Sequence, residues 1–408
     1  MKTQFVPDLL KRVTFILTIW FFCSSQADPL DNWTSSQVST NPFGFNGLWM
    51  TDVTSGNGRY VTVGQYTGDD NGVVQTSEDG MNWTMRSLHD YSILDLYGVT
   101  YGNGKFVAVG WDYFAGHNIY HSTNGINWTS HTTSIANLYA VTYGGGLFVA
   151  VGDGVLLNSS SKTTANIYIS EDAITWSAVD SVALVADVHA LRDVAYGGGN
   201  FVAVDGSGYF YISSDGYDWT RTANSRAGNR VSFCKDRFYV PAGAGTNLVS
   251  TNGLTWSLLT NNTASTFGRV VYVNGFFAAL SGTNVFTSGD GTNWTKRILP
   301  TASNVTLTGI ASGDRNLVAV GYTSPSLPLL PKAYVSDSYV ALRITAESSP
   351  QLQISGLQNR SYRIDYLNDF QSSNWQSLTN FSLTNSPLLW TDVTATNSQR
   401  FYRAVLLP

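Results

Sequence analysis

Three arginines at matching places in successive repeats are the side chains of this chain best suited to binding chemistry. The chain repeats a segment of strand-like sequence, called here the strand phrase, of which residues 96–110 are one copy. When the copies are aligned on their Phe or Leu, Arg230 and Arg269 fall at one equivalent place, and Arg192 precedes that place by one residue. Guanidinium groups that converge can bind an anion through paired N–H donors. The alternative is that these arginines form structural ion pairs with Asp193 and other carboxylates around a solvated channel. Arg192, Arg230 and Arg269 are therefore a candidate anion-binding set.

Two carboxylates occupy the same equivalent place in other repeats, namely Asp52 and Asp193. A pair of carboxyl groups on either side of a glycosidic bond is the minimum requirement for glycoside hydrolysis. Glutamates are scarce, since Glu78 and Glu171 belong to a separate turn motif and Glu347 lies near the C-terminus. No residues are assigned as catalytic, and a glycoside hydrolase is kept as the alternative function.

An aromatic loop is the second candidate binding site. It contains Trp111, Asp112, Tyr113, Phe114 and His117. Exposed aromatic rings beside Asp and Asn suit sugars, which stack on ring faces and form hydrogen bonds at their edges. The alternative is that the rings pack over the junction between repeats, although aromatic residues in loops often serve recognition.

The histidines show no metal-ligand spacing such as His-x-x-x-His. They are His89, His117, His121, His131 and His189, and surface or packing roles are predicted for them. The segment from Gly68 to Gly72 lacks the acidic pattern of a calcium loop and is predicted to be a turn. We expect no metal and no cofactor.

A repeated unit of short strands must position these side chains. The phrase from Leu96 to Gly110 returns at 138–152 and 191–205, with looser copies elsewhere. Each copy predicts two strands joined by a Gly/Asn turn, because Asn and Gly tolerate the positive φ of tight hairpins. A third strand leads into a box, Ser-x-Asp/Asn-Gly-x-x-Trp, and a fourth strand follows it. Four antiparallel strands per repeat indicate the blades of a β-propeller.

The box occurs six times and is predicted to be structural. Its Asp or Asn side chain can accept backbone N–H groups two residues on, its Gly supplies a left-handed position, and its Trp fills the space between sheets. The six pairs are Asp79 and Trp83, Asn124 and Trp128, Asp172 and Trp176, Asp215 and Trp219, Asn252 and Trp256, and Asp290 and Trp294. In one copy Ala173 replaces the Gly.

The strand phrase occurs seven times but the box only six. The segment from Asp31 to Ser36 matches the strand that follows a box, Ile126 to His131. We therefore predict that the N-terminal strand completes the last blade and closes the ring, which removes open sheet edges.

The box resembles the Asp-box, or BNR repeat, of sialidase-like propellers, whose form Ser-x-Asp-x-Gly-x-Thr-Trp has one more residue between Asp and Gly. The resemblance covers about residues 31–340. It implies that the box is a turn between the third and fourth strands, on the rim away from the functional face. It also implies what a sialidase would need: an arginine cluster to bind a carboxylate, a Tyr with a neighbouring Glu as the nucleophile pair, and an Asp as the acid/base. The Arg-Ile-Pro segment of that family is absent, and no Tyr/Glu pair can be assigned. Xyloglucanase-like members use two propellers to build a cleft, and this chain has one.

The composition and the N-terminal segment limit the classes of protein to which this chain can belong. Charged residues are 12% of the 408 residues, about half the usual share, and the net charge is −5, so no basic patch is available for nucleic acid. Residues 1–27 are predicted to be a secretory signal, with an apolar run from Val13 to Phe22 that is too short to span a bilayer. Cys234 is then the remaining cysteine and is predicted to be buried in a strand.

The sequence predicts an all-β protein: a signal peptide at 1–27, a seven-bladed β-propeller closed by the N-terminal strand at 28–341, and a small β-sandwich-like domain at 342–408. We expect a secreted or cell-surface monomer without a transmembrane segment in the mature chain. Its predicted role is recognition of a glycan or an extracellular protein through the propeller loops. A glycoside hydrolase and a structural scaffold are the alternatives.

Overall fold

The computed structural model describes most of the chain from Leu30 onward. The described residues are 30, 32–36, 38, 47–66, 72–86, 88, 94–112, 117–132, 136–154, 165–179, 189–223, 228–273, 276–300, 304–313, 316–323, 330–336, 340–346, 350–356, 361–368, 375–384, 388–394 and 400–407. The predicted signal segment, 1–27, lies outside them.

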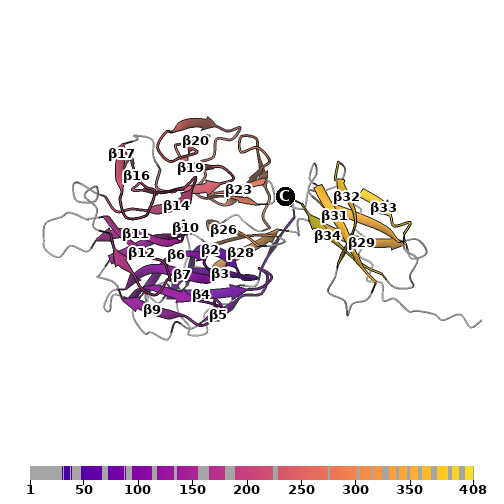
Figure 1. The fold of residues 1–408 in the computed structure, drawn as a ribbon, viewed down its shortest axis with the longest axis horizontal. Helices are drawn as coiled ribbons and strands as arrows, with labels where there is room; N and C mark the ends of the chain where they lie inside the picture. The colour runs from indigo at the N-terminus through magenta and orange to yellow at the C-terminus, as the bar shows by residue number, and fades with distance from the viewer. Residues whose placement is uncertain are drawn as a thin grey trace, which may run out of the picture.

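Seven four-stranded antiparallel sheets form the blades of a propeller, arranged around a centre in Figure 1. The inner two strands of the blades, in order, are β2 (Leu48–Gly56) and β3 (Arg59–Tyr66), β6 (Leu94–Gly102) and β7 (Lys105–Asp112), β10 (Ala136–Gly144) and β11 (Leu147–Gly154), β14 (Asp193–Gly197) and β15 (Asn200–Val204), β18 (Ser232–Cys234) and β19 (Arg237–Pro241), β22 (Val270–Val273) and β23 (Phe276–Ser281), and β26 (Val305–Ser312) and β27 (Leu317–Thr323). The outer two are β4 (Gly72–Ser77) and β5 (Thr84–Arg86), β8 (His117–Ser122) and β9 (Thr129–Thr132), β12 (Ala165–Ser170) and β13 (Ser177–Ala178), β16 (Tyr209–Ser213) and β17 (Thr220–Ala223), β20 (Thr246–Ser250) and β21 (Ser257–Thr260), β24 (Asn284–Ser288) and β25 (Trp294–Arg297), and β28 (Pro331–Ser336) with β1 (Trp33–Ser35).

The N-terminal strand closes the ring, as the sequence predicts. β1 pairs antiparallel with β28, so the seventh sheet has the order β1-β28-β27-β26. Trp33 lies opposite Ser336 and is 7% exposed. It packs with residues of blades six and seven, among them Phe276 and Tyr334. Its indole Nε1 donates to the carbonyl of Leu30, 2.9 Å away.

The six boxes form turns with one shared hydrogen-bond pattern. In the first, the Asp79 carboxylate accepts the backbone N–H groups of Met81 (2.7 Å) and Asn82 (2.9 Å), and Trp83 Nε1 donates to the carbonyl of Gly80. The same two N–H acceptances recur at Asn124, Asp172, Asp215, Asn252 and Asp290. Gly80 has φ +75°, and Ala173 adopts φ 62° at the equivalent position of blade three. The boxes therefore hold the third-to-fourth-strand turns, as predicted.

Each box lies beside the inner hairpin of the preceding blade. The side chain of Asn316, in the β26–β27 hairpin, donates to the carbonyl of Asp79. Asn200, in the β14–β15 hairpin, donates to the carbonyl of Asn252 at 3.0 Å. Boxes and inner hairpins thus share one rim, called here the box rim. The opposite rim, where each inner strand begins, is called here the loop face.

The core is divided among the interfaces between neighbouring blades. Trp128, for example, joins Val61 and Val63 of blade one with Phe106 and Tyr120 of blade two. Sheet packing there is close enough to require glycine: a Cβ at Gly102 would lie 2.1 Å from the ring of Tyr143 on the next blade. Cys234 is buried in β18, as predicted.

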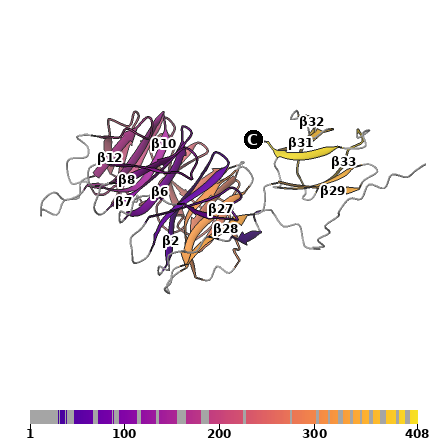
Figure 2. The same ribbon diagram turned by 90° about the horizontal axis from the view of Figure 1, so that it is seen from below.

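Two further sheets follow the propeller and lie beside it in Figures 1 and 2. One contains β29 (Val340–Ala346), β30 (Gln351–Gly356) and β33 (Leu388–Thr391), and the other contains β31 (Ser361–Leu367), β32 (Gln376–Ser382) and β34 (Phe401–Leu406). Leu352, Ile354 and Ile364 form the core between them. The predicted boundary at 341/342 falls within β29. In the described part of the chain, no helix is long and apolar enough to cross a membrane.

Candidate functional site

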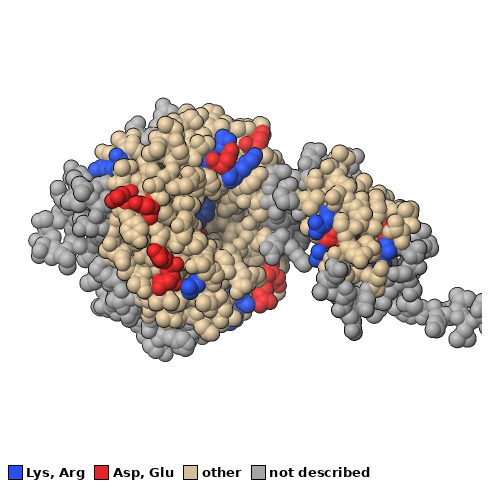
Figure 3. Space-filling view, viewed as in Figure 1, with Lys and Arg blue, Asp and Glu red and all other residues tan. Residues whose placement is uncertain are grey.

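The inner strands surround a central channel, which is the hollow at the middle of the ring in Figure 3. The cavity has a volume of about 360 Å³. Its charged lining residues are Asp52, Asp193 and Arg269, from blades one, four and six. Two of the predicted carboxylates and one of the predicted arginines therefore meet in this channel.

Irregularities near the start of four inner strands turn side chains toward the next blade. The pairing register shifts between Met50 and Asp52, and equivalent shifts occur in blades two, three and seven. A β-bulge of this kind leaves one residue without a ladder partner and re-aims its side chain. The Thr51 hydroxyl in blade one consequently donates to the carbonyl of Leu96 in blade two, at 2.7 Å.

Asp52 and Asp193 tie neighbouring blades together through backbone amides. Each carboxylate accepts the N–H of the next residue in its own strand and the N–H of a residue in the following blade. The donors are Val53 (2.9 Å) and Val99 (3.2 Å) for Asp52, and Val194 (3.0 Å) and Val231 (3.1 Å) for Asp193. Both aspartates are buried. These contacts join blade one to blade two and blade four to blade five near the start of their inner strands.

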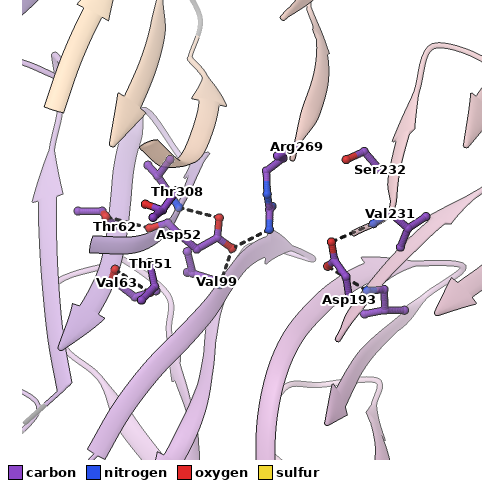
Figure 4. Close-up of polar contacts among 12 residues, drawn as sticks. Thr51, Asp52, Thr62, Val63, Val99, Asp193, Val231, Ser232, Arg269 and Thr308 are labelled. Carbon is purple, nitrogen blue, oxygen red and sulfur yellow. Dashed lines mark hydrogen bonds and ion pairs between the residues drawn. The ribbon is translucent and has the colours of Figure 1, made fainter. Parts of the chain in front are cut away.

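Arg269 extends from blade six into the channel and lies between the two aspartates, as Figure 4 shows. Its Nη2 is 3.3 Å from Oδ2 of Asp52. Burial raises the pKa of the Asp52 carboxyl above its usual value, and the charges of Arg269 and Arg230 oppose this effect. Burial disfavours the Arg269 cation, but the carboxylates of Asp52 and Asp193 outweigh it and raise the arginine pKa. The channel thus holds one cation, Arg269, between two carboxyl groups, and the charge of Arg230 acts on Asp52 from outside the cavity lining.

The three predicted arginines have different surroundings. Arg269 pairs with Asp52, whereas Arg230 does not line the cavity and acts on Asp52 only through its charge. The Arg192 side chain instead lies over the ring of Tyr139, with its guanidinium carbon 4.7 Å from the ring centroid. The structure therefore places two of the arginines near Asp52 and the third on an aromatic ring, where it is exposed.

Two tyrosines adjoin Arg192 at the loop face, and the sequence analysis did not single them out. Tyr97 and Tyr139 are the bulge residues of blades two and three, and their ring centroids lie 5.5 Å apart. Tyr97 donates to the carboxylate of Asp95 (3.0 Å) and Tyr139 to that of Asp153 (2.9 Å). Burial and these carboxylates raise the pKa of both phenols, so the tyrosines stay neutral donors. The signal in the sequence was a Tyr repeated at one place of the strand phrase.

The predicted binding loop begins beside these tyrosines. Trp111 is half-buried near the end of β7, opposite Asp95 in the strand register, and Asp112 is buried. His117 is the first residue of β8. Tyr113 and Phe114 lie outside the described residues. From Trp111 through Tyr97 and Tyr139 to Arg192, partly exposed side chains extend along the loop face of blades two to four; these four residues are called here the loop-face row.

No group of three or more His, Cys, Asp or Glu side chains that could hold a metal ion occurs within the described ranges. No known family model matches the chain. No curated protein matches it either.

Several solved structures share the fold. Ycf48, solved bound to a D1 peptide, has a TM-score of 0.55 and 16% identity, with 75% of this chain and 97% of that chain covered. The WD40 domain of Neurospora crassa Pan2 has a TM-score of 0.53 and 8% identity, covering 75% and 96%. The WD40 propeller domain of Doa1 has a TM-score of 0.52 and 11% identity, covering 74% and 97%. At these identities the likeness shows the seven-bladed propeller fold alone.

Proposed function

We propose that this chain is an exported, monomeric binding protein that recognises a glycan or an extracellular protein through its loop face. We also propose that it is a non-catalytic relative of the Asp-box propellers, because its six boxes share the turn geometry described above. The observation that carries the binding function is the loop-face row. It presents an exposed guanidinium, two tyrosine rings and an indole on one side of the ring.

The chemistry of the row suits recognition better than turnover. Arg192 offers charged N–H donors beside an aromatic face, and such groups are enriched at the centres of binding sites. The tyrosines are held in place by Asp95 and Asp153, so little side-chain entropy is lost when a ligand binds. A propeller of the same fold, Ycf48, was solved bound to a D1 peptide, so this fold can serve in binding.

A binding screen with variants on the two rims tests this proposal. The full mature chain is applied to a glycan array and used to capture proteins from extracellular material. Trp111→Ala and Arg192→Ala should each weaken ligand binding by about tenfold or more, as expected for contact residues of a binding site. Tyr217→Ala is the matched control, because Tyr217 is an aromatic residue on the box rim that is 50% exposed. Binding that depends on Tyr217 and not on the loop-face row would place the site on the box rim and contradict the proposal.

The alternative function, a glycoside hydrolase, would have to use Asp52 and Asp193. Both carboxylates accept two backbone N–H groups, and Asp52 also contacts Arg269. These contacts stabilise the carboxylate anion and occupy part of its lone pairs, which makes it a poorer nucleophile or general base. Hydrolysis of chromogenic glycosides that is lost in Asp193→Asn, while the fold is retained, would reverse this preference.

A further inference from the structure

Two histidines that flank one box in the sequence meet on the outer strands of blade two. His121 belongs to β8 and His131 to β9, and a box lies between them in the chain. In the register of these strands Ile119 is opposite His131 and His121 is opposite Thr129, so the two histidines are diagonal neighbours on one face of the sheet. Nδ1 of His121 is 2.6 Å from Nε2 of His131.

The geometry directs one ring nitrogen of each imidazole at the other. The ring centroids are 4.7 Å apart and the planes are inclined by 30°. Both side chains are half-buried, and burial is the main cause that lowers the pKa of both imidazoles. Neutral imidazoles carry a lone pair on one nitrogen, and that form is the one that ligates metals.

We propose that His121 and His131 form a two-imidazole site for a late first-row transition-metal dication, of the class Zn²⁺, Cu²⁺ or Ni²⁺. Imidazole nitrogen suits these ions, whereas Mg²⁺ and Ca²⁺ prefer oxygen. The imidazole that donates in the pair moves its proton to its other ring nitrogen, so that both facing nitrogens bind the ion through their lone pairs. Bonds of about 2.0–2.1 Å to each nitrogen require only a small opening of the pair. Water completes the coordination.

Nearby charges act on a bound cation in both directions. At His121 the positive charge of Lys105 disfavours a cation and is a larger effect than the opposing charge of Asp172. The Asp172 carboxylate, in the box of blade three, favours positive charge at both imidazoles. Because the described residues hold no third ligand-type side chain at this place, two protein ligands bind the ion, with an affinity well below that of closed structural sites.

The site would join β8 to β9 and therefore bind the folded chain in preference to the unfolded chain. A ligand of this kind raises the midpoint of thermal unfolding in proportion to the logarithm of its concentration above the dissociation constant. The histidine pair on the outer strands is separate from the loop-face row. Metal binding by this pair can therefore be tested independently of the proposed function.

Metal titration of the tag-free mature chain tests the proposal. Isothermal titration with NiCl₂ or ZnCl₂ should give one site, and His121→Asn and His131→Asn should each weaken it by about tenfold or more, since even residues that only orient ligands have effects of this size. His189→Asn is the matched control, because His189 is exposed and lies outside the pair. Each variant is first compared with wild type in EDTA by its unfolding midpoint, which should be unchanged within error.

A spectroscopic measurement on the unaltered chain guards against variants that fold poorly. With one equivalent of Cu²⁺, the electron paramagnetic resonance spectrum should show hyperfine coupling to two equatorial imidazole nitrogens. Coupling to one nitrogen or none would overturn the proposal. So would His121→Asn or His131→Asn chains that bind Ni²⁺ or Zn²⁺ as tightly as wild type.

Discussion

Removing the indole of Trp33 should open the propeller at its seam. Trp33 is 7% exposed, and its Nε1 donates to Leu30 just as each box tryptophan donates to the residue three positions before it. A buried indole removes about 150–250 Å² from water, worth about 4–6 kcal/mol at ~25 cal/mol per Å². After allowing for the methyl group that remains, Trp33→Ala should lower the free energy of unfolding by about 3–5 kcal/mol.

The position of Trp33 in a terminal strand adds a second consequence. β1 is held to β28 by three residue pairs, so loss of the indole favours its detachment. Detachment exposes the edge of β28, which can then pair with another chain. Trp33→Ala should therefore lower the urea midpoint and also produce concentration-dependent dimers or larger species in size-exclusion chromatography.

Two controls separate closure from ordinary core damage. Trp128→Ala removes an equally buried indole from blade two, and its Nε1 contact to Gly125 is also lost, but no terminal strand depends on it. It should destabilise by a similar amount without self-association. Ile298→Ala, at a side chain that is 80% exposed, should change neither property. A Trp33→Ala chain with the midpoint and the elution volume of wild type would refute the closure argument.

Other predictions concern the channel, the turns and pH. Arg269→Met should lower the free energy of unfolding by about 3 kcal/mol at pH 7.5, because Asp52 is left buried without its cation; in a double-mutant cycle with Asp52→Asn the losses should be clearly less than additive. Burial already raises the folded-state pKa of Asp52 above the unfolded value, and removing Arg269 raises it further. The urea midpoint of Arg269→Met should therefore rise as pH falls from 7.5 toward 5. A difference in urea midpoint between wild type and Arg269→Met that does not change with pH would contradict this. Lys235→Gly, at an exposed residue with φ 61°, should raise the free energy of unfolding by up to about 1 kcal/mol in urea titrations, whereas Gly104→Ala at φ +74° should lower it. Hydrogen bonds in the box depress the pKa of Asp79 to about 2. The carboxylate therefore stabilises the folded chain above the unfolded pKa of about 4, and this stabilisation is lost as pH falls toward 2. The urea midpoint of Asp79→Asn should drop less between pH 6 and pH 3 than that of wild type.

The blade count, the box turns and the closing strand followed from local sequence signals. Gly and Asn in the hairpins, Ser and Asp in the boxes and the Trp spacing act within a few residues, so their effects are readable without the fold. The match between Asp31–Ser36 and Ile126–His131 was enough to place β1 against β28.

The candidate sites depend on contacts between blades, and the sequence does not show which residues meet across a blade interface. Alignment placed Asp52 and Asp193 at equivalent positions, yet their partners Val99 and Val231 come from the following blades. Arg192 was grouped with Arg269 by its place in the repeat, but the bulge that carries Tyr139 made an aromatic ring its nearest partner. The sequence likewise separated His121 from His131 by a box, and only the strand register brought their rings together.

The sequence by itself determined the frame of this protein: seven repeated four-strand units, turns fixed by the boxes, and a terminal strand able to complete the last blade. These features rest on backbone conformation and short-range hydrogen bonds, which each repeat encodes locally. Tertiary structure alone decided which charges meet in the channel and which rings and cations line the loop face. Those outcomes depend on distances across blade interfaces and across the ring axis, where a shift of a few ångströms changes the partner of a side chain.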